Sequence, residues 1–234
     1  MSAGRLYGLG IGPGDPELIT LKALRILQSA PVVAYPVSDR EKSLARSIVA
    51  EYLGHAPLEL PLYFPFKAEE SAQPHYDKAA ITLADHLSRG QDVAVLCEGD
   101  PFFYGTFMYL FTRLAGRFRI EVVPGVSSLM ASASVLETPL TYRNDVFVVL
   151  PAMLPADILA SRLAGADAAV IIKLGRHFPQ VYEVLKQMGL LARARYIQCA
   201  TMPNQHVAPI DQVDPRQVPY FSMIVIPSQW QAAD

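Results

Sequence analysis

Residues 92–106 read DVAVLCEGDPFFYGT, and this stretch indicates both the fold class and the place of a binding site. Residues 92–97 contain a continuous apolar run, typical of a strand buried on both faces of a parallel sheet. Two acids and a glycine follow at 98–100, and Pro101 comes where a helix would begin. Ligands of open α/β sheets bind outside the carboxyl ends of the strands, so this strand end is expected to face a ligand.

Strands and helices alternate through the rest of the chain, which predicts an α/β fold. Further strands are expected at 5–11, 32–35, 58–62, Arg119–Val123, 146–150, 169–174 and 195–199, with helical patterns between them. Residues 205–210 and 221–226 are two strand candidates without an intervening helix, which predicts a closing antiparallel pair. We therefore expect two α/β subdomains, residues 1–117 and 118–234, the second with a mixed sheet.

Composition excludes several classes of protein. Lys plus Arg number 20 against 22 Asp plus Glu, and this balance argues against a dedicated binder of duplex nucleic acid. No apolar run is long enough to span a membrane, and the N-terminal residues lack the pattern of a signal peptide. Cys97 and Cys199 cannot form a disulfide framework, and the five histidines show no ligand spacing. A cytoplasmic chain without a metal site is expected.

A glycine-rich loop, GLGIGPGD at residues 8–15, follows the first expected strand. Its glycines permit close approach of the backbone to a ligand, and Asp15 with Pro16 resembles the start of a helix. The loop invites comparison with a dinucleotide fingerprint, but GxGxxG would require glycine at Asp15 or at Pro13. A glycine-rich turn with a purely structural role is the alternative reading.

Three more turns follow expected strands: VPGVSS at 123–128, KLGRH at 173–177 and CATMPNQ at 199–205. Ser127 and Ser128 have the residue type of helix caps, as has Asp100, and capping is compatible with ligand contact. Together with the two loops above, these turns predict one crevice that holds a sizeable polar ligand.

The segments GIGPGDPELITLKA (10–23), EGDPFFYGT (98–106), VPGVSS (123–128) and ATMPNQ (200–205) together resemble the tetrapyrrole (corrin/porphyrin) methylases. This resemblance covers nearly the whole chain. It implies a class III methyltransferase fold with S-adenosylmethionine in the cleft between two α/β subdomains, S-adenosylhomocysteine as a product, and a homodimer. Residues 97–110 and 63–69 look most like the precorrin-2 C20-methyltransferases of cobalamin synthesis, which form precorrin-3A.

The resemblance also implies roles for particular residues. Cofactor contacts are expected from Glu98, Gly99, Asp100, Phe103, Ser127, Ser128, Leu174, Ala200 and Thr201. The first glycine loop faces the substrate in this family, so substrate contacts are expected from Pro13, Gly14 and Asp15. Guanidinium and ammonium groups suit the substrate's carboxylates, which adds Arg40, Lys67 and Arg176 from expected loops.

Several alternatives stay open from sequence. A proton must leave C20 after methylation, and Asp15, Glu98, Asp100 and His177 are all candidates for the base. The substrate is either metal-free precorrin-2 or the cobalt-bearing factor II of the anaerobic route, and another ring carbon is a further possibility. A nicotinamide-dependent reductase and a non-enzymatic ligand carrier represent other classes of protein, and turnover distinguishes the carrier from an enzyme.

Overall fold

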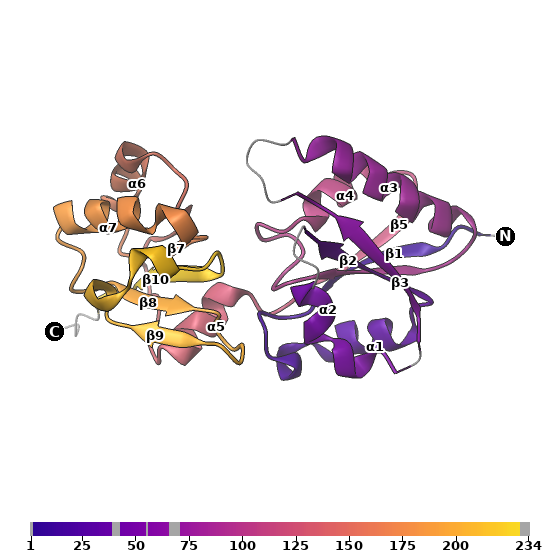
Figure 1. The fold of residues 1–234 in the computed structure, drawn as a ribbon, viewed down its shortest axis with the longest axis horizontal. Helices are drawn as coiled ribbons and strands as arrows, with labels where there is room; N and C mark the ends of the chain where they lie inside the picture. Colours follow the sequence, from indigo (N-terminus) through magenta and orange to yellow (C-terminus); the bar gives the residue numbers. More distant parts are fainter. Residues whose placement is uncertain (1, 39–42, 55, 66–70, 230–234) are drawn as a thin grey trace. The chain divides into compact units, whose positions relative to one another are not determined.

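The computed structural model describes residues 2–38, 43–54, 56–65 and 71–229, and the chain divides into two compact units. Unit 1 is Met1–Ser127 and unit 2 is Ser128–Asp234 (Figure 1). The division lies later than the expected boundary at 117/118. The reason is long-range pairing: β5 (Arg119–Val123) lies in parallel beside β1 (Arg5–Gly10), with Leu9 opposite Val123, so it belongs to the first sheet.

Unit 1 is built on a five-stranded sheet in the order β3-β2-β4-β1-β5, and every pairing in it is parallel. The other strands are β2 (Val32–Val37), β3 (Leu58–Tyr63) and β4 (Val93–Cys97). The helices are α1 (Leu21–Ser29), α2 (Leu44–Ile48), α3 (Gln73–Ser88) and α4 (Phe107–Leu114), with short 3-10 turns at Pro16–Leu18 and Ala50–Tyr52.

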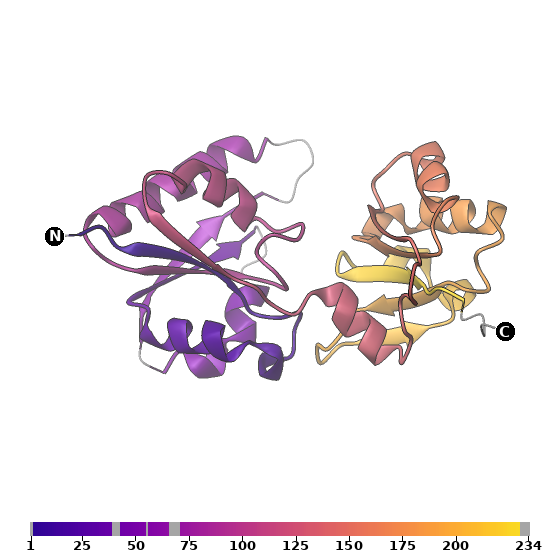
Figure 2. The ribbon, with the colours of Figure 1, turned by 180° about the vertical axis from the view of Figure 1, so that it is seen from behind.

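Helices cover both faces of this sheet, as Figures 1 and 2 show. Alternate residues of β4 point to opposite sides, so Val93 and Val95 pack in the cluster that includes α3 and α4. Ala94 and Leu96 pack in the second cluster, which includes α1 and α2. The whole of β4 is buried, which explains why its sequence is apolar at every position and not at alternate ones.

The strand order creates a switch point between β1 and β4. From β1 the chain passes through α1 to β2 on one side, whereas from β4 it passes through α4 to β5 on the other. Open α/β sheets bind their ligands at such a point, where the connections of two neighbouring strands leave in opposite directions. Both the first glycine loop and residues 98–101 follow directly from these two strand ends.

Unit 2 contains a second five-stranded sheet, in the order β6-β7-β10-β8-β9. Its strands are β6 (Phe147–Pro151), β7 (Ala168–Ile172), β8 (Arg195–Gln198), β9 (His206–Ala208) and β10 (Ser222–Ile226). β6 and β7 are parallel and the other pairings are antiparallel. The expected pairing of the last two strands with each other is wrong, because β10 inserts between β7 and β8 and leaves β9 at the edge.

The helices of unit 2 are α5 (Ser128–Val135), α6 (Ala156–Leu163) and α7 (Phe178–Gln187). Apolar side chains of α6 and α7, including Leu159 and Val181, pack with Ile171 and Ile224 of the sheet in one buried cluster. Within the part of the chain that the structure describes, no helix has the length and apolar character needed to cross a membrane.

Candidate active site

Three loops of unit 1 meet at the carboxyl end of its sheet. The first follows β1, the second follows β4 at 98–101, and the third follows β5 at 124–126. The Ile11 amide donates to the Cys97 carbonyl at 3.0 Å, and the Gly99 amide donates to the Gly12 carbonyl at 2.8 Å. The first two loops are thus joined by backbone hydrogen bonds at the switch point.

Glycine is required where these loops touch. A Cβ atom on Gly10 would lie 2.6 Å from Cα of Gly125 and 2.8 Å from the carbonyl oxygen of Gly99. A Cβ on Gly125 would overlap the same Gly99 oxygen, and Gly99 itself has a φ of 65°. The three backbones therefore pack against one another with no space for side chains.

Asp100 accepts hydrogen bonds with both carboxylate oxygens. Its Oδ1 accepts from the Phe102 amide at 2.9 Å, which closes the local turn. Its Oδ2 accepts from the Gly125 amide at 3.1 Å, which joins the second loop to the third. Asp100 does not cap the next helix, because α4 begins only at Phe107; its side chain closes a local turn instead, and the long-range bond to Gly125 was not predicted.

The Glu98 carboxyl lies at the end of β4, beside the first turn of α2. Burial raises the pKa of Glu98, while hydrogen bonds from its own backbone amide and that of Ala45 partly offset the rise. A cavity of about 20 Å³ lies between Glu98, Thr106 and the ring of Phe107, and it is too small for a cofactor.

Ser127 presents an unpaired polar atom at the end of the third loop. Its hydroxyl oxygen is buried and has no hydrogen-bond partner among the described residues. A buried hydroxyl without a partner is costly, and such groups in native proteins call for an explanation. A bound polar ligand at this loop would supply the missing partner.

The first glycine loop holds the residues expected to face the substrate. Pro13 and Gly14 are buried, and Asp15 is partly exposed. Oδ1 of Asp15 accepts from the Glu17 amide at 2.9 Å, so Asp15 caps the 3-10 turn Pro16–Leu18. The predicted helix start at Asp15 is therefore displaced: α1 begins after Thr20, whose hydroxyl accepts from the Ala23 amide at 3.2 Å.

Aromatic side chains surround the carboxyl end of β3 and β4. Tyr63, Phe102 and Tyr104 are each more than 40% exposed, whereas Phe64 is buried in the core. Tyr104 has a φ of 53°, a conformation that is uncommon outside glycine, and the predicted helix begins only at Phe107. Such strain is often found at functional sites, where the surrounding structure enforces it.

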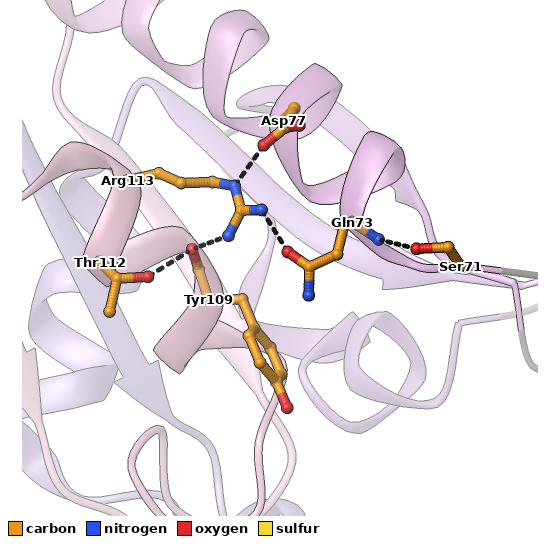
Figure 3. A network of polar contacts seen from close by, with 6 residues as sticks. All are labelled: Ser71, Gln73, Asp77, Tyr109, Thr112 and Arg113. Carbon is orange, nitrogen blue, oxygen red and sulfur yellow. Dashed lines mark hydrogen bonds and ion pairs between the residues drawn. The ribbon is translucent and has the colours of Figure 1, made fainter.

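A polar network beside these aromatics holds α3 against α4 (Figure 3). The Arg113 guanidinium donates to Asp77 at 2.6 Å, to Gln73 at 2.7 Å and to the carbonyl of Tyr109 at 3.0 Å. It also lies 5.6 Å from the ring centroid of Tyr76, which stacks on Tyr109. Sequence reasoning missed this network, because its partners are far apart in the chain.

In unit 2, the expected cofactor residues lie at the ends of β7 and β8. Both strands are antiparallel to β10, so their carboxyl ends lie at the same edge of the sheet. Lys173, Cys199 and Thr201 have positive φ angles of 61°, 50° and 66°. Three strained residues at the ends of the two strands that flank β10 favour a binding role for this edge.

The individual residues of this edge differ in what they can offer a ligand. Leu174 is fully buried in the core of unit 2, and its amide donates to the Ser222 carbonyl at 3.3 Å. Ala200 is buried as well, and the Thr201 amide donates to Gln205 at 2.7 Å. Ser128 is the first residue of α5, partly exposed. The cofactor roles of these residues stay predictions.

Basic residues expected near the substrate have different placements. Arg176 is exposed and His177 partly exposed, both in the 3-10 turn Gly175–His177. Arg40 and Lys67 lie outside the described residues. Arg46 donates to both carboxylate oxygens of Glu59, at 3.0 and 3.1 Å, and is thus held on the surface of the first sheet.

No cluster of three or more histidine, cysteine or acidic residues suited to a metal ion occurs within the described ranges. Burial raises the pKa of both cysteine thiols, which keeps them protonated and chemically quiet.

Comparison with known proteins identifies the family to which this chain belongs. Residues 5–214 match the model of the Tetrapyrrole (Corrin/Porphyrin) Methylases. This chain is a member of that family. The match spans most of the chain and includes all three loops of unit 1 as well as the strand ends of unit 2.

Three curated relatives are similar to this methylase. "Cobalamin biosynthesis protein CobIJ" of Mycobacterium tuberculosis is 44% identical over 97% of this chain, which spans only 47% of that relative. "Precorrin-2 C(20)-methyltransferase" of Sinorhizobium sp is 39% identical over 97% of this chain and 96% of its own length. "Cobalt-precorrin-2 C(20)-methyltransferase" of Salmonella typhimurium is 32% identical over 99% of both chains.

Solved structures agree with the fold of this methylase. The uroporphyrin-III C-methyl transferase of Thermus thermophilus, complexed with S-adenosyl homocysteine, has a TM-score of 0.68 at 26% identity. The alignment covers 96% of this chain and 92% of the other. The expected α/β class and methylase fold are therefore confirmed.

Proposed function

We propose that this methylase transfers a methyl group from S-adenosylmethionine to carbon C20 of precorrin-2, giving precorrin-3A in cobalamin biosynthesis. The observation that carries the proposal is the 39% identity to a precorrin-2 C(20)-methyltransferase over nearly the full length of both chains. The relatives first matched are about twice as long as this chain, and the proposal concerns only the activity that this chain contains. Membership of a methylase family leaves the nicotinamide-dependent reductase without support.

The residues of unit 1 fit an S-adenosylmethionine ligand. The glycine-lined backbone of the three loops offers close approach, and the buried Ser127 hydroxyl lacks a partner. When bound, S-adenosylmethionine supplies a methyl group activated by its sulfonium. We assign its binding to the backbone of residues 98–100 with Ser127, Ser128 and Phe103, and to Leu174, Ala200 and Thr201 from unit 2. The S-adenosyl homocysteine complex of the Thermus thermophilus enzyme supports this cofactor class.

The same strand ends supply groups for an anionic, planar macrocycle. Exposed rings of Tyr63, Phe102 and Tyr104 can pack on its faces, because aromatic side chains stack on conjugated surfaces. The exposed guanidinium of Arg176 can bind a peripheral carboxylate. Positioning accounts for most of the catalysis, since an aligned pair of reactants needs no strong general base to lower the barrier.

Of the four candidates for the base, the geometry favours Asp15 and His177, which take no part in the contacts that residues 98–100 make with the other loops. Asp100 uses both oxygens for backbone amides, and Glu98 is buried beside α2. Asp15 and His177 are partly exposed. We assign proton removal from C20 to one of these two, and the pH profiles of Asp15→Asn and His177→Gln separate them.

The cobalt-bearing substrate is the second candidate, favoured by the 32% identity to the cobalt-precorrin-2 enzyme over 99% of both chains. Paired turnover assays decide between them. The chain is incubated with S-adenosylmethionine and either metal-free precorrin-2 or cobalt-factor II, and product mass and methyl position are measured. We expect methylation at C20 of the metal-free ring. Exclusive methylation of the cobalt form assigns the chain to the anaerobic route, and no transfer to either ring contradicts the proposal.

We also propose that the chain forms a homodimer in the cytoplasm. The support is membership of the tetrapyrrole methylase family, whose resemblance implied this assembly from the sequence. Light scattering coupled to size exclusion tests the dimer, and a monomeric mass at micromolar concentration would contradict it.

A further inference from the structure

Residues 98, 99 and 100 each contact a different segment of unit 1. Glu98 lies near the Ala45 amide in the first turn of α2, which lowers the pKa of its carboxyl against the larger effect of burial. The Gly99 amide donates to the Gly12 carbonyl in the first glycine loop. Asp100 accepts from the Gly125 amide in the third loop. Three consecutive residues thus join three segments that are separated by dozens of residues in sequence.

Both carboxylate oxygens of Asp100 accept hydrogen bonds from backbone amides. One oxygen accepts from Phe102 two residues later, and the other accepts from Gly125 across the gap between loops. The contact continues through the backbone, because Gly125 packs on the carbonyl oxygen of Gly99 and on Gly10. The carboxylate therefore bridges the second and third loops where their backbones are already in contact.

We propose that Asp100 is a positioning residue for methyl transfer: its carboxylate holds the Gly125 amide and so sets the spacing of the two loops that bind the cofactor, and it takes no proton from the substrate. The inference deepens the proposed function, because it concerns the same site. It replaces two roles expected from sequence, direct cofactor contact by the Asp100 side chain and general-base catalysis.

The hydrogen bonds argue against proton transfer at Asp100. A proton from C20 bound to either oxygen would neutralise the carboxylate and weaken both of its bonds to backbone amides, because a charged acceptor makes the stronger hydrogen bond. The bond from Gly125 lies in a partly buried position, where a poorly satisfied amide is unfavourable, whereas the bond from Phe102 is exposed. The same bonds keep the loop spacing fixed before any ligand arrives, which is the preorganisation that methyl transfer requires.

Asp100→Asn is the direct test. Asparagine retains one oxygen for the Phe102 amide, but its amide nitrogen then faces the Gly125 amide, so only the bond between loops is lost. Asp100→Ser is a second variant, since its short hydroxyl can still close the local turn but cannot reach Gly125. Asp214→Asn is the matched control, because Asp214 closes a similar turn by accepting from the Arg216 amide at 3.0 Å.

The first readout is hydrogen exchange of the Gly125 amide in the ligand-free full chain. Loss of a hydrogen bond to a charged group is expected to accelerate this exchange by about tenfold or more in both Asp100 variants. The Asp214 control should leave it unchanged. Unchanged exchange at Gly125 in the Asp100 variants overturns the inference, whether or not the chain methylates a tetrapyrrole.

The second readout is the pH dependence of turnover. A positioning role predicts weaker binding of S-adenosylhomocysteine in Asp100→Asn, with the same apparent pKa values in the kcat profile as the wild type. Loss of the rising limb of that profile, with unchanged cofactor affinity, would assign Asp100 as the base and refute the inference. Failure of all turnover in the wild type refutes only the proposed function, since the exchange measurement needs no substrate.

Discussion

Gly10→Ala tests whether close packing of the three loops determines cofactor binding. The added Cβ would lie 2.6 Å from Cα of Gly125 and 2.8 Å from the Gly99 oxygen, where ordinary contact begins near 3.4 Å. The Gly125 nitrogen would lie closer still, so the loops must separate by more than about 0.8 Å. Only backbone atoms are in the way, so no side-chain rotation can relieve the overlap.

The expected cost follows from that displacement. Overpacking of this kind destabilises a protein by about 1–3 kcal/mol. A misplacement of about 1 Å at a reacting site can lower the rate by up to about 10²-fold. We expect unfolding in urea at lower denaturant, weaker binding of S-adenosylhomocysteine by calorimetry, and a reduced kcat.

Gly54→Ala is the control, because no atom lies within 4 Å of its added Cβ and the same unit carries it. Its affinity and kcat should match the wild type. The reasoning is refuted if Gly10→Ala binds and turns over like the wild type, because the loops would then open without consequence.

Three further substitutions probe other parts of the chain. Burial raises the pKa of the Glu98 carboxyl above its usual value of about 4.3, so the folded chain holds this proton more tightly than the unfolded chain does. The stability that comes from this proton is lost as pH rises from the usual pKa through the raised one. Glu98→Gln should therefore flatten the dependence of the free energy of unfolding on pH in this interval, measured by urea titrations at several pH values. Arg113→Met removes the 2.6 Å bond to Asp77 and should lower the free energy of unfolding by about 1 kcal/mol, and no change in the denaturation midpoint contradicts it. Tyr196→Phe removes a buried hydroxyl that donates to Gln198 at 2.6 Å, and a loss of about 1 kcal/mol is expected by thermal unfolding.

Local patterns predicted the strands of this chain well. The apolar run at 92–97 became β4, and the strand expected at Arg119–Val123 has the same bounds in the structure. β4 lies between β2 and β1 and is buried at every position, so hydrophobicity alone identifies it. β5 is an edge strand in which only Val123 is buried. The helix starts were less predictable: Asp15 caps a 3-10 turn, and the positive φ of Tyr104 delays α4 to Phe107.

Pairings between distant segments were beyond local patterns. The insertion of β10 between β7 and β8 depends on contacts across the whole of unit 2. No local pattern indicates a partner for Arg46 of α2, yet Glu59 of β3 binds it through both carboxylate oxygens. The Asp100–Gly125 bond is of the same kind, because nothing in either segment alone specifies the other. Motif resemblance predicts which residues form the site, and only the structure shows which of their side chains already have hydrogen-bond partners.

The loops whose backbones pack together and the aromatic rings that are exposed to solvent are expected to differ in how they affect the choice of substrate. The three loops of unit 1 consist of close-packed backbone, and any residue larger than glycine at Gly10 or Gly125 forces them apart. A site of that rigidity can hold one cofactor but cannot adapt to different rings. The rings of Tyr63, Phe102 and Tyr104 are exposed, and each also packs against a neighbouring ring. Tyr104→Ala should therefore raise KM for the tetrapyrrole and leave the affinity for S-adenosylhomocysteine unchanged, whereas Gly10→Ala should weaken the cofactor with every substrate. A Tyr104→Ala variant that binds the cofactor more weakly, with an unaltered tetrapyrrole KM, would show that recognition of the two ligands is not divided in this way.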